Sequence, residues 1–63
     1  GFLPSRGGIV VEDDVWIGAN CVFLDGSILR QGCVVAAGTV VRGEIAAYTV
    51  WAGDPPRQIG ARQ

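Results

Sequence analysis

The side chains that could do chemistry in this 63-residue chain are few. The sequence contains one acidic cluster, Glu12, Asp13 and Asp14, two cysteines and no histidine. Paired carboxylates can bind a metal ion or share acid and base catalysis, but neighbouring residues of a strand point to opposite faces. We therefore expect the acidic cluster to be a solvated corner of the fold.

The two cysteines, Cys21 and Cys33, are twelve residues apart. Two thiols without a histidine do not make a zinc site, and a catalytic thiol here would lack a base. We expect both to be free thiols that serve as small hydrophobic residues, without a disulfide between them.

Trp16 is the aromatic residue that we consider the strongest candidate for an interface or a ligand-binding site. It comes directly before an apolar residue that we expect to point inward, so the indole should point outward. An outward Trp usually packs against a neighbouring subunit or a ligand.

The element that must position these side chains is a six-residue repeat from Val11 to Ala46: VEDDVW, IGANCV, FLDGSI, LRQGCV, VAAGTV, VRGEIA. Each repeat begins with a sizeable apolar residue: Val11, Ile17, Phe23, Leu29, Val35 and Val41. Its fifth position is small or β-branched: Val15, Cys21, Ser27, Cys33, Thr39 and Ile45. Its fourth position holds Asp14, Asn20, Gly26, Gly32, Gly38 and Glu44. The pattern predicts two inward columns and one corner column.

Gly, Asn and Asp tolerate positive φ, so their recurrence predicts a chain that turns a corner every six residues. Glu44 is the one exception in the corner column. Between corners the chain is rich in Val and Ile, which favours short strands over helices. A hexapeptide period is typical of a parallel β-helix, and the fold class we predict is all-β. Gly8 and Ile9 fit the same pattern and indicate a partial repeat before Val11.

If three repeats make one triangular turn, equivalent residues recur every eighteen positions and stack on one another. The predicted pairs are Val11 with Leu29, Val15 with Cys33, Ile17 with Val35, Cys21 with Thr39, Phe23 with Val41 and Ser27 with Ile45. Most pairs are apolar, so two turns can share one core. The hydroxyls of Ser27 and Thr39 must each find a hydrogen-bond partner.

Length and composition allow one domain, residues 1–63, with an entry loop at 1–8, coils at 9–53 and a tail at 54–63. Pro55 and Pro56 are expected to stop any strand from continuing. The chain is 49% hydrophobic with a net charge of −1 and no lysine, so we expect no nucleic-acid partner. Its longest uncharged run, 31–41, is too short to span a membrane, and a cytoplasmic protein is the default expectation.

The runs VEDDVWIGANCVFLDGS, GCVVAAGTVV and AAYTVWAGDPPRQIG, which together cover nearly the whole chain, closely resemble the C-terminal half of the hexapeptide-repeat acyltransferases. These include the maltose, galactoside and polysaccharide O-acetyltransferases. The resemblance implies a left-handed parallel β-helix, a homotrimer or stacked trimers, acetyl-coenzyme A as cofactor and a sugar or polysaccharide as acceptor. Left-handed crossovers break the usual right-handed rule, so the handedness comes from the resemblance alone.

The resemblance also implies which residues bind the cofactor. Trp16 matches a tryptophan beside the pantetheine arm and the acceptor, and Ala19 and Ala37 match small positions whose backbone meets that arm. Arg42 occupies a position near the cofactor that is often Thr or another polar residue. Arg57 matches a basic residue near the nucleotide phosphates. Gly43 and Gly60 replace basic residues that are common in the family, so the phosphate-binding end is reduced.

The family's catalytic base is a histidine upstream of the matching stretch, and this chain contains none. The same absence excludes the metal site of the related γ-class carbonic anhydrases. The sequence therefore predicts no catalytic residue and no metal ligand in this chain, and two hypotheses remain. Either the chain is the cofactor-binding part of an O-acetyltransferase whose histidine lies outside it, or it is a non-catalytic trimerising module for assembly or coenzyme A binding.

Overall fold

The computed structural model describes residues 8–62, which form nine short strands and no helix. The strands are β1 (Val10–Val11), β2 (Trp16–Ile17), β3 (Val22–Phe23), β4 (Ile28–Leu29), β5 (Val34–Val35), β6 (Val40–Val41), β7 (Glu44–Ile45), β8 (Thr49–Ala52) and β9 (Arg57–Ala61). Between residues 8 and 62, therefore, no helix is long and apolar enough to cross a membrane.

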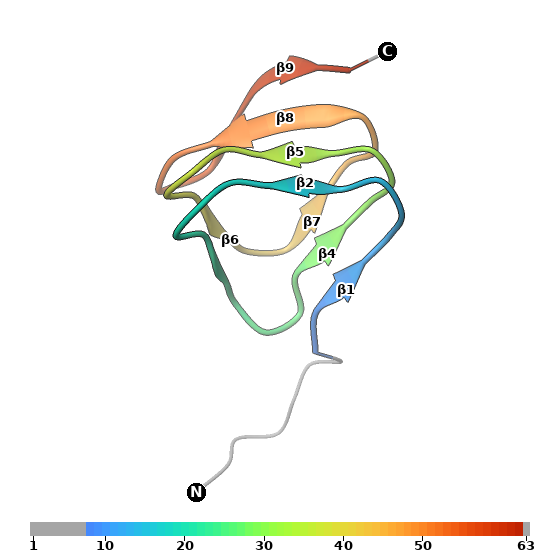
Figure 1. Cartoon of the computed structure of the whole chain (residues 1–63). Helices are drawn as coiled ribbons and strands as arrows, with labels where there is room; N and C mark the ends of the chain where they lie inside the picture. Colours follow the sequence, from blue (N-terminus) through green and yellow to red (C-terminus); the bar gives the residue numbers. More distant parts are fainter. Residues whose placement is uncertain (1–7, 63) are drawn as a thin grey trace, which may run out of the picture.

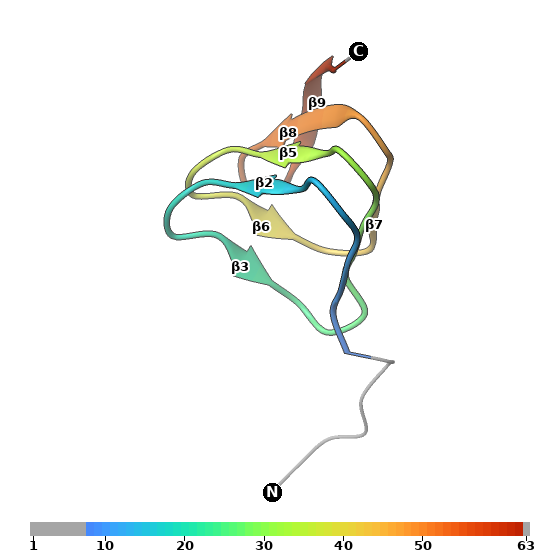
Figure 2. The ribbon, with the colours of Figure 1, turned by 45° about the vertical axis from the view of Figure 1, so that its right-hand side comes forward.

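The strands form three sheets, in the orders β1-β4-β7, β2-β5-β8-β9 and β3-β6. All pairs are parallel except β8 with β9. The chain visits the three sheets in turn, so the sheets are the sides of a triangular coil (Figures 1 and 2). The predicted fold class, a left-handed parallel β-helix of two to three coils, is confirmed.

The predicted corners are confirmed at five of six positions, where φ is positive: Asp14 (60°), Asn20 (60°), Gly26 (86°), Gly32 (71°) and Gly38 (77°). The sixth corner lies at Gly43 (φ 76°), one residue before Glu44. Glu44 instead begins β7. The mismatch at Glu44 therefore marked a corner displaced by one residue, onto a glycine that takes positive φ without strain.

The displaced corner also corrects the predicted stacking of Ser27 on Ile45. Four residues, 24–27, connect β3 to β4, whereas Arg42 and Gly43 alone connect β6 to β7. The spacing of paired residues therefore falls from eighteen, between Val11 and Leu29, to sixteen, between Leu29 and Ile45. Ile45 is buried, but in the column that begins each repeat.

The core lies in the second and third coils. Its fully buried members, each 0–1% exposed, are Leu29, Cys33, Val35, Val41 and Ile45. The Ser27 hydroxyl donates to the carbonyl of Val41 (3.1 Å), and the Thr39 hydroxyl donates to that of Ala36 (2.7 Å). Both hydroxyls thus have the partners that burial requires, and both cysteines are free as predicted.

The C-terminal part of the chain forms a structure that the sequence did not predict. The prolines were expected to stop any strand, but they lie in a turn at 53–56 that reverses the chain into β9, antiparallel to β8. Trp51 of β8 pairs with Val35 and packs against the core, and its indole N–H donates to the Thr49 hydroxyl (2.8 Å). This end of the core is therefore covered by the chain itself.

Candidate functional site

The outer face of the β2-β5-β8-β9 sheet carries a column of apolar side chains. Trp16 pairs with Val34, and Val34 pairs with Val50. Ile17 pairs with the buried Val35, so Ile17 points inward and the neighbouring Trp16, which is 61% exposed, points outward as predicted. A cavity of about 250 Å³ opens on this face, lined by Trp16, Ile17, Gly18, Val34, Val35 and Ala36. An apolar surface with an exposed indole at its edge suits an extended, weakly polar ligand.

A line of small residues runs along the same sheet at the ends of its strands. Gly18 donates its N–H to the carbonyl of Val35 (2.8 Å), and Ala36 donates to that of Trp51 (2.9 Å). Gly18, Ala36 and Ala52 therefore occupy equivalent places on successive coils, and we call them the small-residue column. Arg57 of β9 pairs with Ala52. With strands about 4.8 Å apart, Arg57 lies roughly 14 Å along the sheet from Gly18.

Gly18 is required by the packing of the first coil on the second. A Cβ added there would lie 2.5 Å from the backbone nitrogen of Ala37 and 2.8 Å from its Cα. Real Cβ atoms do not approach backbone this closely, so any larger residue would separate the coils. The residue at position 18 must therefore be glycine so that the first coil can pack on the second.

Ala19 and Ala37 lie next to the small-residue column, not in it. They follow Gly18 and Ala36 directly in the chain, are exposed, and stack at one corner where Gly38 donates its N–H to the Ala19 carbonyl (2.9 Å). The cavity lining includes neither residue. Their predicted contact with a pantetheine arm stays a prediction.

The two predicted cationic residues lie near one turn but differ in their contacts. Arg42 forms an ion pair with Asp54, with 3.6 Å between Nη2 and Oδ1. Arg57 is exposed, and its side chain has no hydrogen bond or ion pair to any residue between 8 and 62. Arg57 is thus the cation in the described part of the chain that can receive a phosphate without losing a partner.

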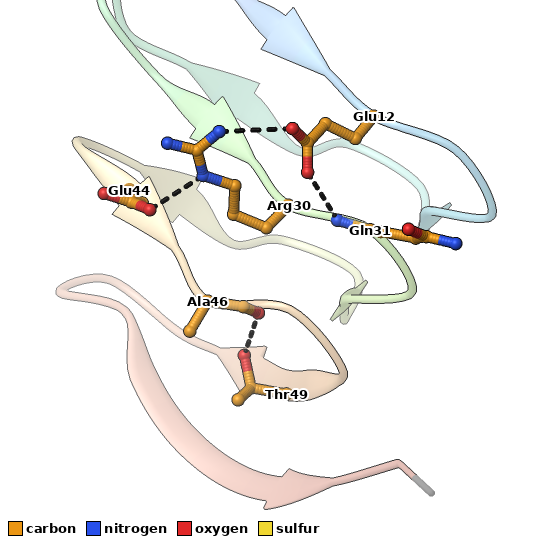
Figure 3. A network of polar contacts seen from close by, with 6 residues as sticks. All are labelled: Glu12, Arg30, Gln31, Glu44, Ala46 and Thr49. Carbon is orange, nitrogen blue, oxygen red and sulfur yellow. Dashed lines mark hydrogen bonds and ion pairs between the residues drawn. The ribbon is translucent and has the colours of Figure 1, made fainter.

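The carboxylates on the neighbouring sheet are committed to a structural network. Arg30 donates to Glu44 (2.7 Å) and to Glu12 (3.1 Å), and Glu12 also accepts the backbone N–H of Gln31 (2.9 Å) (Figure 3). The hydrogen bond to Glu44, and then that to Glu12, raises the pKa of Arg30 above its ordinary value. The network links three coils and does not reach the cavity.

The lining of the cavity contains no side chain that could accept a proton. Cys33, the buried thiol nearest in sequence to Val34, points into the core, and burial raises the pKa of its thiol. The arrangement in residues 8–62 can therefore hold an extended ligand with an anionic end, and it offers no general base beside it.

Sequence reasoning missed the small-residue column and Asp54. The sequence did contain a signal for the column, because Gly18 and Ala36 are eighteen residues apart. The third member of the column, Ala52, follows Ala36 by only sixteen residues, because the displaced corner at Gly43 shortens the coil. Asp54 carried no signal, because its partner Arg42 is twelve residues away and is brought near by the reversal at the prolines.

Comparison with known proteins gives a consistent result. Residues 8–43, more than half of the chain, match the family described as bacterial transferase hexapeptide (six repeats). A 2,3,4,5-tetrahydropyridine-2,6-dicarboxylate N-acetyltransferase of Staphylococcus aureus is 46% identical over 56 residues, which is 89% of this chain and 23% of the relative. The chain thus spans about a quarter of the length of the curated relatives it matches.

Two solved structures are similar to the fold. A mutant of AntD, an N-acyltransferase from Bacillus cereus in complex with dTDP and coenzyme A, superposes with a TM-score of 0.86 at 26% identity, covering 90% of this chain and 31% of AntD. A maltose O-acetyltransferase from Clostridium difficile 630 superposes with a TM-score of 0.83 at 33% identity, covering 87% and 29%.

Proposed function

Because this chain belongs to the bacterial transferase hexapeptide family, we propose that it is the donor-binding part of an acyltransferase and holds acetyl-coenzyme A along the small-residue column. The observation that carries the proposal is the position on one sheet of the exposed Trp16, the small-residue column and Arg57, whose side chain has no partner among residues 8–62. The names of its relatives and the coenzyme A in the AntD complex support it.

The residues present fit such a cofactor. Ala36 and Ala52 carry only a methyl group, so an extended arm can approach their backbone closely, and Trp16 offers an apolar face at one end. At Gly18 the space of a Cβ is filled by the Ala37 backbone, so the glycine there serves the packing of the coils. Arg57, at the other end, offers a guanidinium that can bind a phosphate through two donors. Acetyl-coenzyme A supplies the acetyl group as an activated thioester, and the chain's own residues bind it and orient it.

The acceptor is proposed to be a sugar hydroxyl, as in the maltose O-acetyltransferase, and the N-acetyltransferase relatives make an amine the competing choice. Residues 8–62 place no proton acceptor beside the cavity. The proposal therefore assigns removal of the acceptor's proton to a residue outside this range.

We further propose that the chain works as a homotrimer or as stacked trimers. Outward apolar residues occur on all three sheets, including Val10 (44% exposed), Trp16 (61%) and Val22 (50%). A chain of this size buries a modest core, so association of these faces would add stability. Light scattering should give the mass of three chains or a multiple of it, and a folded monomer at micromolar concentration would contradict this part.

A non-catalytic module for assembly or coenzyme A binding is the second candidate. The absence of a proton acceptor beside the cavity of residues 8–62 favours it. The first candidate predicts coenzyme A binding and acetyl transfer to an acceptor when a base is supplied, whereas the second predicts no acetyl transfer, with or without coenzyme A binding. An acetylation assay with the longest natural polypeptide that contains this chain separates them.

Calorimetry with coenzyme A tests the proposed site. We expect binding by the 63-residue chain, weakened about five- to tenfold in Arg57→Ala, because one charge-assisted contact is lost at an exposed position. Trp16→Ala should weaken it by a similar factor. Arg30→Gln is the matched control. It removes a cation from the network of Glu12, Arg30 and Glu44 on the neighbouring sheet, and it should leave the affinity for coenzyme A unchanged. No heat with the intact chain, or equal affinity in Arg57→Ala, would refute the site.

A further inference from the structure

We infer that Asp54 weakens the binding of this site to the phosphates of its ligand, by holding Arg42 in an ion pair and by adding a negative charge three residues before Arg57. The inference rests on the proposed function. It identifies Asp54 as a residue that determines how much of the donor's binding comes from its phosphate end.

The scaffold brings Arg42 and Asp54 together. Arg42 follows β6, and Asp54 lies in the turn between β8 and β9. Val40 donates its N–H to the carbonyl of Gly53 (3.3 Å), and Gly53 donates its own to the Thr39 hydroxyl (3.2 Å). These bonds fix the turn against the start of β6, and because β6 is only two residues long, Arg42 at its far end still reaches Asp54.

The ion pair is loose enough for a ligand to compete for Arg42. Its 3.6 Å separation is longer than a good hydrogen bond, and the two side chains are 59% and 58% exposed. Exposed pairs of this kind contribute little to folding stability. A phosphate with several oxygens is a stronger acceptor for a guanidinium than one distant carboxylate oxygen.

Arg57 sits three residues beyond Asp54, where β9 begins. Arg42, Asp54 and Arg57 together carry a net charge of +1, with Asp54 in the turn, Arg42 paired to it and Arg57 directly after the turn. An approaching phosphate meets the attraction of Arg57, the partly neutralised Arg42 and the repulsion of Asp54. Because Asp54 weakens the contribution of the phosphates, most of the binding free energy comes from the pantetheine arm, which we propose lies along the small-residue column.

The test compares wild type with Asp54→Asn, which keeps the shape of the side chain and removes its charge. Calorimetry at low and at physiological salt would use coenzyme A, 3′-dephospho-coenzyme A and pantetheine. We expect Asp54→Asn to bind coenzyme A about three- to tenfold more tightly at low salt, with a smaller gain at physiological salt. Pantetheine, which has no phosphate, should bind both proteins equally. 3′-Dephospho-coenzyme A shows which phosphate Arg42 reaches, because it lacks the 3′ group but keeps the diphosphate.

Two controls isolate the ion pair. Asp13→Asn removes the same charge from a different corner, so an equal gain there would mean that net charge alone acts and would overturn the inference. Arg42→Ala combined with Asp54→Asn should lose most of the gain, because the released guanidinium is absent.

The failures are distinguishable. Equal coenzyme A affinity in wild type and Asp54→Asn would overturn the role of Asp54 and leave the proposed function standing. Absence of coenzyme A binding in every variant would overturn the proposed function, and the inference with it. A gain that extends to pantetheine would also overturn the inference, because the effect would not depend on phosphate.

Discussion

The two ends of the coil stack differ, although both grow from the same six-residue repeat. In the second and third coils the inward side chains of Leu29 and Val41 are fully buried. In the first coil the equivalent Val11 and Ile17 are 50% and 45% exposed. The strands of the first coil have a paired strand on one side only, and their inward side chains are half exposed. β6 and β7 are also edge strands, yet Val41 and Ile45 are buried, so burial at this end depends on the chain that follows them. A single repeat is therefore not a unit of stability.

The C-terminal end is closed by two devices. Trp51 packs against the core from above, and Arg62 at the end of β9 reaches back across the coils. Arg62 donates its side chain to the carbonyl of Gly32 (2.9 Å), lies 3.7 Å from the Asp14 carboxylate, and donates its backbone N–H to Tyr48 (2.6 Å). One residue thereby ties together the corner of all three coils.

Truncation of a valine at each end measures this difference most directly. Val41→Ala should lower the free energy of unfolding by about 2 to 3 kcal/mol, because it removes a buried side chain and leaves a cavity. Val11→Ala, the same change at the exposed end, should cost less than about 1 kcal/mol. Denaturant unfolding at one fixed protein concentration measures both, and equal losses would contradict the account of the two ends.

Glycine substitution tests how tightly the first coil is held. Gly18→Ala should cost about 2 kcal/mol, because its Cβ would collide with the Ala37 backbone. Gly60→Ala is the control at the other end, where the nearest atom to an added Cβ is 3.8 Å away, and should change stability by less than about 0.5 kcal/mol. A tolerated Gly18→Ala would show that the coils separate more easily than the packing implies.

Removal of the Arg62 side chain should loosen the closed end. Arg62→Ala should cost about 1 kcal/mol, a modest value because the side chain is 34% exposed. Hydrogen exchange of the β8 and β9 amides should accelerate more than that of β3 and β6. Arg57 lies at the start of β9, and its side chain has no partner among residues 8–62, so Arg57→Ala should leave exchange unchanged. Uniform acceleration would mean that Arg62 does not act locally.

The buried thiol gives a smaller, pH-dependent effect. Burial raises the pKa of Cys33 above its ordinary value of 9.0. Above that pH the unfolded chain releases the thiol proton while the folded chain retains it, so stability falls as pH rises. The slope is at most about 1.4 kcal/mol per pH unit, the value for one proton. Cys33→Ala should remove this component from the unfolding free energy between pH 8 and about 10, and an unchanged slope would contradict it.

The last prediction compares the rates at which a thiol reagent modifies the two cysteines. Cys21 of the first coil is half-buried, whereas Cys33 is fully buried. A thiol reagent should therefore modify Cys21 at least about tenfold faster under native conditions. Cys21→Ser should abolish the fast phase, and a fast phase that persists would show that the core opens readily.

The repeat predicted the coils and most of the core because the columns depend only on the local period. Cys33, Thr39 and Val41 fell where the columns placed them. Counting in sixes failed at Glu44, because a glycine one residue earlier could make a shorter corner. β9 was missed because Pro55 and Pro56 indicate where a strand ends, but not that the chain will reverse and pair again.

The candidate site was predictable in part for the same reason. The outward direction of the Trp16 side chain followed from its place directly before Ile17, which belongs to an inward column. The pairing of Arg42 with Asp54 depended on that reversal and on the bond between Val40 and Gly53, which no local pattern specifies. Contacts between distant segments that do not follow the six-residue period were therefore the part that the sequence could not supply.

An amide-resolved NMR titration of the chain with coenzyme A tests the central claim most directly. The account predicts shifts at Gly18, Ala36, Ala52 and Arg57, with the amides of Glu12 and Glu44 on the neighbouring sheet unchanged. Shifts confined to that neighbouring sheet, or none at the small-residue column under saturating ligand, would contradict the claim that this face binds the donor.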